Sequence, residues 1–183
     1  MKPRPWETLA RERLRDCRVF RVDRVIARSP SGAEHDFFCI DSAEWVNIVP
    51  ITVNDELVMV RQFRHGSQSL TLEIPGGMVD PGEAPAEAAA RELLEETGYR
   101  ALRVMSVGAV NPNPALFGNR VHTFVAPGAE KVAEIRNDGA EETVVELVPV
   151  AEIPRLVRAG RIDHALVLAG LYQWELLRRL EKE

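Results

Sequence analysis

Cysteine is scarce in this chain, because Cys17 and Cys39 are the only two among its 183 residues. They lie too far apart for a Cys-x-x-Cys redox or zinc motif, so we expect reduced thiols without a role in function. The sequence also lacks an apolar run long enough to span a membrane, and its first residues lack the apolar core of a secretory signal. We therefore expect a cytoplasmic protein without a membrane partner.

An excess of positive charge is missing as well. The chain has 23 Lys and Arg residues against 28 Asp and Glu residues, which gives a formal net charge of −5. This balance argues against broad nucleic-acid binding, although single arginines can still hold a phosphate group. The apolar share of 45% is ordinary for a soluble enzyme with one full core and a small appendage.

The chain does contain a well-marked helix. Pro85 suits the first turn of a helix, and Gly98 is the residue type at which a helix ends in a left-handed conformation. The alanine-rich residues between them favour propagation. The sequence therefore predicts a helix from about Pro85 to Thr97.

Three glutamates on this helix share one face. Glu92, Glu95 and Glu96 stand at positions i, i+3 and i+4, so their carboxylates project together. Like charges repel at this spacing, and hard cations such as Mg²⁺ or Mn²⁺, which prefer oxygen ligands, relieve the repulsion. Taken alone, a Glu-rich helix is more commonly a solvated face, on which Arg91 could merely pair with Glu95.

These glutamates belong to a longer pattern: GMVDPGE from Gly77 to Glu83, then seven residues, then RELLEETGY from Arg91 to Tyr99. Position for position, this segment resembles the signature of the Nudix hydrolases, a family that cleaves nucleoside diphosphates linked to another group. Similarity along most of the chain points to the ADP-ribose and nucleotide-sugar pyrophosphatase branch. The segments that carry it are Trp45–Asn47, Arg61–His65, Leu72–Gly77 and Asn111–Ala115.

The resemblance implies a divalent metal site, with Mg²⁺ as the expected ion and Mn²⁺ as the alternative. In the family, the last glutamates of the signature bind metal directly, and Glu96 is the strongest single candidate here. Glu83 could cap the helix or act as an outer ligand, because a carboxylate favours the positive end of a helix dipole. Arg91 is expected to orient a metal-binding glutamate by pairing with Glu95. The expected metal-site residues, with backbone carbonyls from the two glycines, are Gly76, Gly77, Glu83, Glu92, Glu95 and Glu96.

Hydrolysis also needs a general base. In several enzymes of the branch that this chain resembles, the base lies on a loop after the signature, which points to Glu141 and Glu142 in the segment NDGAEET. Glu141 is the preferred residue of the two. The alternatives are a solvated acidic loop and activation of water by metals or signature glutamates alone. The residues expected in catalysis are Glu141, Glu142, Arg91 and Glu95.

Substrate contacts require donors for phosphates and surfaces for rings and sugars. Arg61 and Arg64 lie on or just beyond a predicted strand, where guanidinium groups can meet phosphate oxygens, although Arg61 could equally serve solubility. Trp45 could stack on a base or belong to the core or a dimer interface. His122 alternates with apolar residues, so it could be a ligand or a structural histidine. The expected substrate-binding residues are Trp45, Arg61, Arg64, Glu73, Pro114, Asn119 and Arg120.

The remaining periodicity predicts strands separated by a few helices. We expect strands at residues 18–27, 34–40, 46–53, 56–63, 70–74, 104–110, 121–125 and 143–148, and further helices at 154–159 and about 165–179. This order predicts an α+β fold, namely an α/β/α sandwich around a mixed sheet, which the Nudix resemblance also implies. The loops at 111–119 and 126–142 are expected to close over the substrate.

The first part of the chain is expected to extend this sandwich. Residues 1–44 are predicted to form an antiparallel β-hairpin, and residues 45–183 the hydrolase domain. A two-stranded hairpin is marginal alone, so it should pack on the main domain or on a second subunit. A homodimer is the expected assembly.

Three classes of function compete. The favoured one is a metal-dependent hydrolase that splits ADP-ribose or a nucleoside diphosphate sugar into a nucleoside monophosphate and a sugar phosphate. The second acts on another linked diphosphate, such as a nucleoside triphosphate, a dinucleoside polyphosphate or capped RNA. The third, a non-enzymatic nucleotide-sugar sensor, is disfavoured because the glutamates of the signature are complete.

Overall fold

The computed structural model describes residues 2–137 and 142–180. The chain divides into two compact units. The first, here called the N-terminal unit, consists of Met1–Ala43 and Asn111–Arg120, and the second, called the large unit, consists of Glu44–Val110 and Val121–Glu183. Within the described residues, no helix combines the length and the apolar character needed to cross a membrane.

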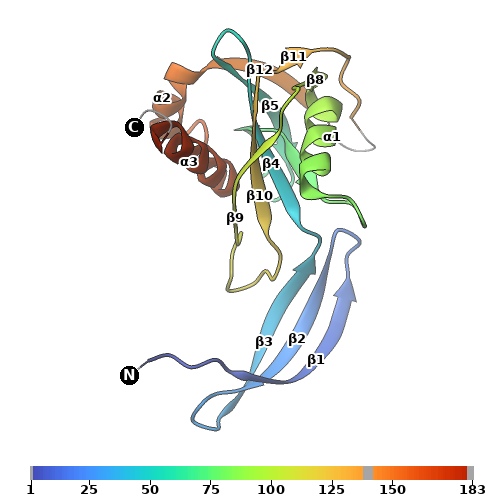
Figure 1. Cartoon of the computed structure of the whole chain (residues 1–183). Helices are drawn as coiled ribbons and strands as arrows, with labels where there is room; N and C mark the ends of the chain where they lie inside the picture. The colour runs from blue at the N-terminus through green and yellow to red at the C-terminus, as the bar shows by residue number, and fades with distance from the viewer. Residues whose placement is uncertain (1, 138–141, 181–183) are drawn as a thin grey trace. The chain divides into compact units, whose positions relative to one another are not determined.

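Three antiparallel strands form the N-terminal unit: β1 (Glu7–Asp16), β2 (Phe20–Arg28) and β3 (Glu34–Ser42), with β2 in the middle (Figure 1). The antiparallel extension expected from the sequence is present, but the expectation of two strands is wrong. Strand β1 has the sequence ETLARERLRD, in which all ten residues are exposed. It shows no apolar alternation because neither of its faces is buried, so sequence periodicity does not reveal it.

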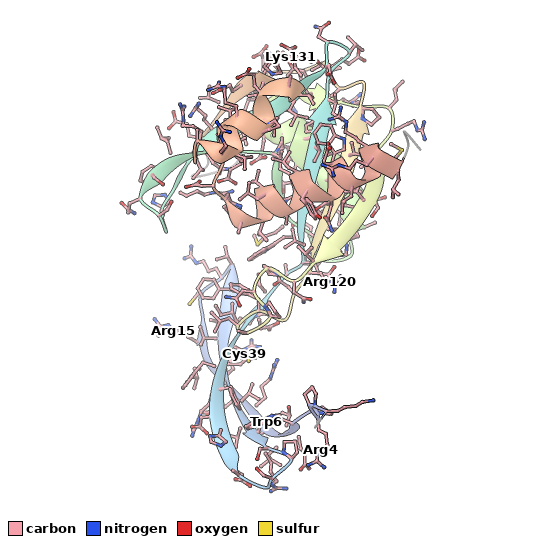
Figure 2. The ribbon with its side chains drawn as sticks, turned by 90° about the vertical axis from the view of Figure 1, so that its left-hand side faces the viewer. Arg4, Trp6, Arg15, Cys39, Arg120 and Lys131 are labelled. Atoms are coloured by element: carbon pink, nitrogen blue, oxygen red, sulfur yellow. The ribbon has the colours of Figure 1, made fainter. Side chains whose placement is uncertain are left out.

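Charge pairs and aromatic contacts join these strands. Asp23 of β2 is buried, accepts a hydrogen bond of 2.5 Å from Arg13 and pairs with Arg11 at 3.4 Å, both on β1. Trp6, labelled in Figure 2, packs edge to face on Phe37 of β3 with ring centroids 5.4 Å apart. Residues Asn111–Arg120 belong to the same unit, since Ile40 donates its backbone N–H to Leu116 at 2.7 Å.

A seven-stranded mixed sheet forms the centre of the large unit. Its main order is β12-β5-β4-β10-β9, with β6 beside β5 and β7 beside β4, and only the β4–β10 pair is parallel. The strands are β4 (Trp45–Ile51), β5 (Glu56–Arg64), β6 (Ser69–Glu73), β7 (Gly76–Met78), β9 (Met105–Val110), β10 (Val121–Pro127) and β12 (Thr143–Pro149). A separate pair joins β8 (Tyr99–Arg100) to β11 (Glu130–Lys131), and β11 lies inside the segment 126–142 that was expected to be loop.

Helices cover both faces of this sheet (Figure 1). Helix α1 (Pro85–Thr97) packs Ala88, Ala89 and Leu93 on Val46 and Ile48 of β4. Helix α3 (Ala165–Leu180) buries an apolar face in a second cluster, and η1 (Val150–Glu152) and α2 (Ile153–Arg158) lead into it. The α/β/α sandwich around a mixed sheet is confirmed, because each face of the sheet is hydrophobic and needs a helical layer.

The two central strands β4 and β5 diverge. They pair with each other only at Ile51 and Leu57, beside the turn that joins them. Further along, β5 pairs with β6 and β4 pairs with β7, so the segment Ile74–Pro75 crosses from one strand to the other. The sheet opens at this end, and the functional cavity lies there.

Candidate active site

A cavity with a volume of about 790 Å³ lies in the large unit. It lies between the β5–β6 hairpin, the start of β4, helix α1 and the residues before α3. Eight of the residues expected from the sequence line it: Trp45, Arg64, Glu73, Gly76, Gly77, Arg91, Glu92 and Glu96. The strand ends and the acidic helix therefore meet at one concave surface, as expected of an active site.

Local chemistry sets the ends of helix α1. Its first turn begins with Pro85, and the side chain of Glu87 accepts a hydrogen bond of 3.2 Å from the backbone N–H of Ala84. Gly98 adopts the left-handed conformation (φ 72°) and donates its N–H to Leu94. Glu87 thus makes the capping contact considered for Glu83.

Two glycines allow the acidic helix to approach the sheet. A Cβ atom on Gly77 would lie 2.3 Å from Oε1 of Glu92, and one on Gly76 would lie 2.2 Å from the carbonyl oxygen of Val46. Neither position accepts a side chain without displacement. The backbone N–H of Gly76 also donates to Oε2 of Glu96 at 3.0 Å, which holds that carboxylate against the sheet. Glu96 is only 4% exposed, so this bond satisfies a buried carboxylate oxygen.

Arg91 donates hydrogen bonds to three glutamates of the acidic face. Its Nε and Nη2 donate to the two oxygens of Glu83, each at 3.0 Å, and its Nη1 donates to Glu92 at 2.9 Å and to Glu95 at 3.0 Å. The bonds to Glu83 are the main cause that raises the pKa of Arg91, and they lower the pKa of Glu83. Arg91 therefore offsets part of the negative charge of Glu83, Glu92 and Glu95 and holds these carboxylates in place.

The donor set at this wall of the cavity fits a divalent cation. Glu92 and Glu96 supply hard carboxylate oxygens beside the backbone of Gly76 and Gly77. Because Gly77 has no Cβ, its backbone lies close to the carboxylate of Glu92. Within residues 2–137 and 142–180, there is no group of three or more His, Cys, Asp or Glu side chains that could hold a metal ion together. The fit rests on Glu92 and Glu96 rather than on all three helix glutamates.

A second charged pair lies across the cavity. Arg64 donates from Nε and Nη2 to the two oxygens of Glu73 at 2.8 and 2.6 Å, and Thr71 donates to Glu73 at 2.6 Å. Burial raises the pKa of the Glu73 carboxyl, but the hydrogen bonds from Arg64 and Thr71 outweigh it, so the pKa lies below its ordinary value of 4.5. Glu73 thereby orients Arg64, whose side chain is 42% exposed.

This geometry agrees with the comparisons. A NUDIX domain model matches residues 42–171. The chain belongs to the Nudix family. Its hydrolase signature coincides with helix α1 and the preceding glycines, so the chain is a Nudix hydrolase.

Similar proteins extend this assignment over the full length. An ADP-ribose pyrophosphatase of Bacillus subtilis (strain 168) is 27% identical over 184 residues, which cover 100% of both chains. An ADP-ribose pyrophosphatase of Mycobacterium tuberculosis is 30% identical over 174 residues, or 93% of this chain and 84% of its own. A crystal structure of an ADP compounds hydrolase has a TM-score of 0.88 at 25% identity and covers 99% of this chain and 98% of its own.

The other predicted site residues of this Nudix hydrolase lie elsewhere. Glu95 contacts Arg91 but lines a different, smaller cavity with Arg100 and Arg136. Arg61 donates to Glu146 of the neighbouring strand β12 at 2.5 Å and does not line the main cavity. Three belong to the N-terminal unit: Pro114, Asn119 and Arg120. Their roles in binding stay predictions.

The expected base region is only partly described. Glu141 lies outside the described residues, and Glu142 is exposed. Thr143, the next residue, is buried and donates from Oγ1 to the carbonyl oxygen of Glu96 at 2.9 Å. On the other side of the segment, the backbone N–H of Arg136 donates to Glu95 at 2.8 Å. Both flanks are thus tied to the last turn of helix α1, beside the metal-site glutamates.

Sequence reasoning missed several polar residues of the cavity. Asn47 donates from Nδ2 to the carbonyl oxygen of Leu166 at 3.0 Å and joins β4 to the start of α3. Asp163 and His164 precede α3 and line the same cavity. No local pattern marks them, because tertiary packing alone brings this turn to the strand ends.

Proposed function

We propose that this Nudix hydrolase cleaves the pyrophosphate bond of ADP-ribose or of another nucleoside diphosphate sugar, giving a nucleoside monophosphate and a sugar phosphate. The observation that carries the proposal is the meeting of Glu92 and Glu96 with Arg64 and Arg91 around one cavity of about 790 Å³. A cavity of this size suits a ligand larger than inorganic diphosphate. The names of the similar pyrophosphatases support the same substrate class.

Magnesium is the proposed ion, held by Glu92 and Glu96 with backbone oxygens near Gly76 and Gly77. A divalent cation in this position supplies neutralisation of phosphate charge and acidification of water. Arg91 keeps the carboxylates ordered through its bonds to Glu83 and Glu92. Nudix hydrolases in general use divalent metals, and hard oxygen ligands favour Mg²⁺ or Mn²⁺ over softer ions.

Arg64 is the proposed phosphate-binding residue of the opposite wall. Glu73 occupies two of its donors, which fixes the guanidinium plane and its direction. Arg64 lines the same cavity as Glu92 and Glu96, and a guanidinium is suited to phosphate oxygens by its charge and its planar array of N–H donors. In this proposal the diphosphate lies between Arg64 and the two glutamates Glu92 and Glu96.

The proposed general base is Glu141, with Glu142 as the alternative. The anchoring of Thr143 to Glu96 supports a base from this segment, because Glu142 directly precedes Thr143. We expect Glu141→Gln to lower kcat about a hundredfold to ten-thousandfold with KM little changed, since loss of a general base acts in the transition state. Steady-state kinetics of Glu141→Gln and Glu142→Gln, measured side by side, assign the base. Unchanged kcat in both variants would leave this segment without a catalytic role.

A substrate screen tests the function itself. Purified protein is incubated with ADP-ribose, ADP-glucose, UDP-glucose or GDP-mannose in Mg²⁺ or Mn²⁺, and the products are separated by ion-exchange chromatography. The expected result is equal release of a nucleoside monophosphate and a sugar phosphate, abolished by a chelator and restored by added metal. Turnover of nucleoside triphosphates or dinucleoside polyphosphates, with no hydrolysis of these nucleoside diphosphate sugars, would overturn the proposal.

A cytoplasmic homodimer is the proposed form of the enzyme. The sheet of the N-terminal unit exposes apolar side chains, among them Trp6, Leu14 and Phe38, which are 44%, 46% and 55% accessible. Pairing of two chains through this unit would remove that area from water. Light scattering at micromolar concentration is expected to give twice the mass of the chain, and a monomer would contradict the assembly.

A further inference from the structure

His164 lines the cavity of the candidate active site, and hydrogen bonds of the neighbouring backbone hold its position. It is the residue before helix α3, and its carbonyl oxygen accepts the backbone N–H of Leu168 at 3.0 Å. The first turn of α3 is held in turn by the bond from Asn47 to Leu166. The backbone of His164 is therefore fixed, while its half-buried side chain lines the cavity together with Arg64 and Glu73.

The two ring nitrogens of His164 have different surroundings. Nδ1 is buried and has no hydrogen-bond partner among the described residues. Nε2 is not among the buried atoms that lack a partner. A buried N–H without a partner costs free energy, so a proton on Nδ1 is disfavoured. The neutral ring therefore carries its proton on Nε2, which makes the accessible edge a hydrogen-bond donor.

The surroundings of His164 are polar, and the neighbouring Glu73 already accepts hydrogen bonds from other side chains. Burial raises the pKa of the Glu73 carboxyl, and the hydrogen bonds from Arg64 and Thr71 outweigh it and lower that pKa below its ordinary value. Glu73 itself is engaged by Arg64 and Thr71. The hydroxyl and amide side chains of Ser69, Thr71 and Gln62 line this part of the cavity. Such uncharged groups suit sugar hydroxyls better than they suit a second metal.

We propose that His164 binds the sugar phosphate half of the substrate by donating an Nε2–H hydrogen bond to one of its oxygens. This inference rests on the proposed function. Glu92 and Glu96 lie on helix α1, whereas His164 precedes helix α3, and these two helices cover opposite faces of the sheet (Figure 1). With the diphosphate at the proposed metal site and Arg64, the part of the cavity around His164 receives the group beyond it. His164 thereby becomes a specificity-determining residue for the sugar.

Kinetics of three variants test the contact. His164→Ala removes the donor, and we expect KM for ADP-ribose to rise about tenfold with kcat within about twofold, the effect of losing one ground-state hydrogen bond. His164→Gln places an amide N–H near the position of Nε2 and should recover most of the affinity. Arg161→Ala is the matched control in the same turn, because Arg161 is exposed and does not line the cavity. Thermal unfolding of each variant checks that the fold persists.

Product inhibition identifies the half of the substrate that His164 contacts. In His164→Ala, the inhibition constant for ribose 5-phosphate should rise about tenfold while that for AMP stays constant. A rise for AMP alone, or unchanged KM in both His164 variants of an active enzyme, would overturn the inference. An inactive wild-type protein in the substrate screen would instead refute the proposed function, so the two failures are distinguishable.

Discussion

The two units of this chain are stabilised in different ways. In the strands of the N-terminal unit only Asp23, Val25 and Ala27 are buried, and the charged side chains pair across the strands at the surface. The large unit has two buried apolar clusters, one on each face of its sheet. The comparison shows that a sheet can be well paired in hydrogen bonds and still lack a core of its own.

Physical magnitudes explain why this difference matters. Exposed ion pairs contribute about 0–1 kcal/mol each, while burial of one large apolar side chain contributes about 1.5–3 kcal/mol. A sheet held mainly by surface pairs is therefore weak in isolation, and its exposed apolar side chains are the reason why we propose a homodimer. The large unit needs no such support for its core, and of its buried polar residues, Gln62, Thr71, Glu73 and Glu96 line the cavity described above.

The largest expected effect concerns two buried carboxylates, one in each unit. Glu96→Gln keeps the volume but removes the charge at the metal site, and we expect kcat/KM to fall by about a thousandfold or more, equivalent to ~4 kcal/mol. Asp23→Asn, the corresponding change in the N-terminal unit, should leave kcat within about threefold. Near-normal turnover of Glu96→Gln in saturating Mg²⁺ would show that this face of α1 is not the metal site.

A matched pair of leucines tests the stability of the units. Leu57 is fully buried in the large unit, and Leu14 of β1 is 46% exposed. We expect Leu57→Ala to lower the free energy of unfolding by about 2–5 kcal/mol, whereas Leu14→Ala should cost less than about 1 kcal/mol. Urea unfolding followed by circular dichroism measures both. An equally large, concentration-dependent cost at Leu14 would mean that this strand is buried in the assembly.

Two aspartates sharpen the account of the N-terminal unit. Asp23 is buried between Arg11 and Arg13, and Asp36 accepts two hydrogen bonds from Arg24 at one exposed carboxylate oxygen. Asp23→Asn should destabilise the protein by roughly 1–3 kcal/mol, because its partners are half exposed and keep part of their hydration. Asp36→Asn should cost less than about 1 kcal/mol and lose even this in high salt. Equal costs would remove the distinction between buried and surface pairs.

The smallest expected effect is the pH dependence due to Glu73. Its folded-state pKa lies below 4.5, so its charged form contributes stability above that value, and this contribution is lost as pH falls through the folded pKa. The stability difference between the wild-type protein and Glu73→Gln should therefore shrink when the pH is lowered from 6 to below the ordinary carboxyl range of about 4. Thermal unfolding across this range measures it. A difference that grows on acidification would contradict the charged Arg64–Glu73 pair.

Prediction from sequence succeeds where local rules apply. Helix α1 agrees with its expected bounds, because Pro85 and Gly98 determine its ends through backbone conformation. Most large-unit strands follow period-two alternation or short apolar runs. Strand β1 escapes because its residues are exposed on both faces and carry no such pattern.

The sequence by itself determined the family and the acidic helix, since these depend on the spacing of residue types within one short segment and on local backbone conformation. Tertiary structure decided the rest of the site. It paired Arg64 with Glu73, separated Arg61 and Glu95 from the main cavity, and brought His164 beside the β5–β6 hairpin. The physical reason is that these contacts depend on strand register and on packing of α3 against the sheet, which join residues far apart in the chain and leave no local periodicity.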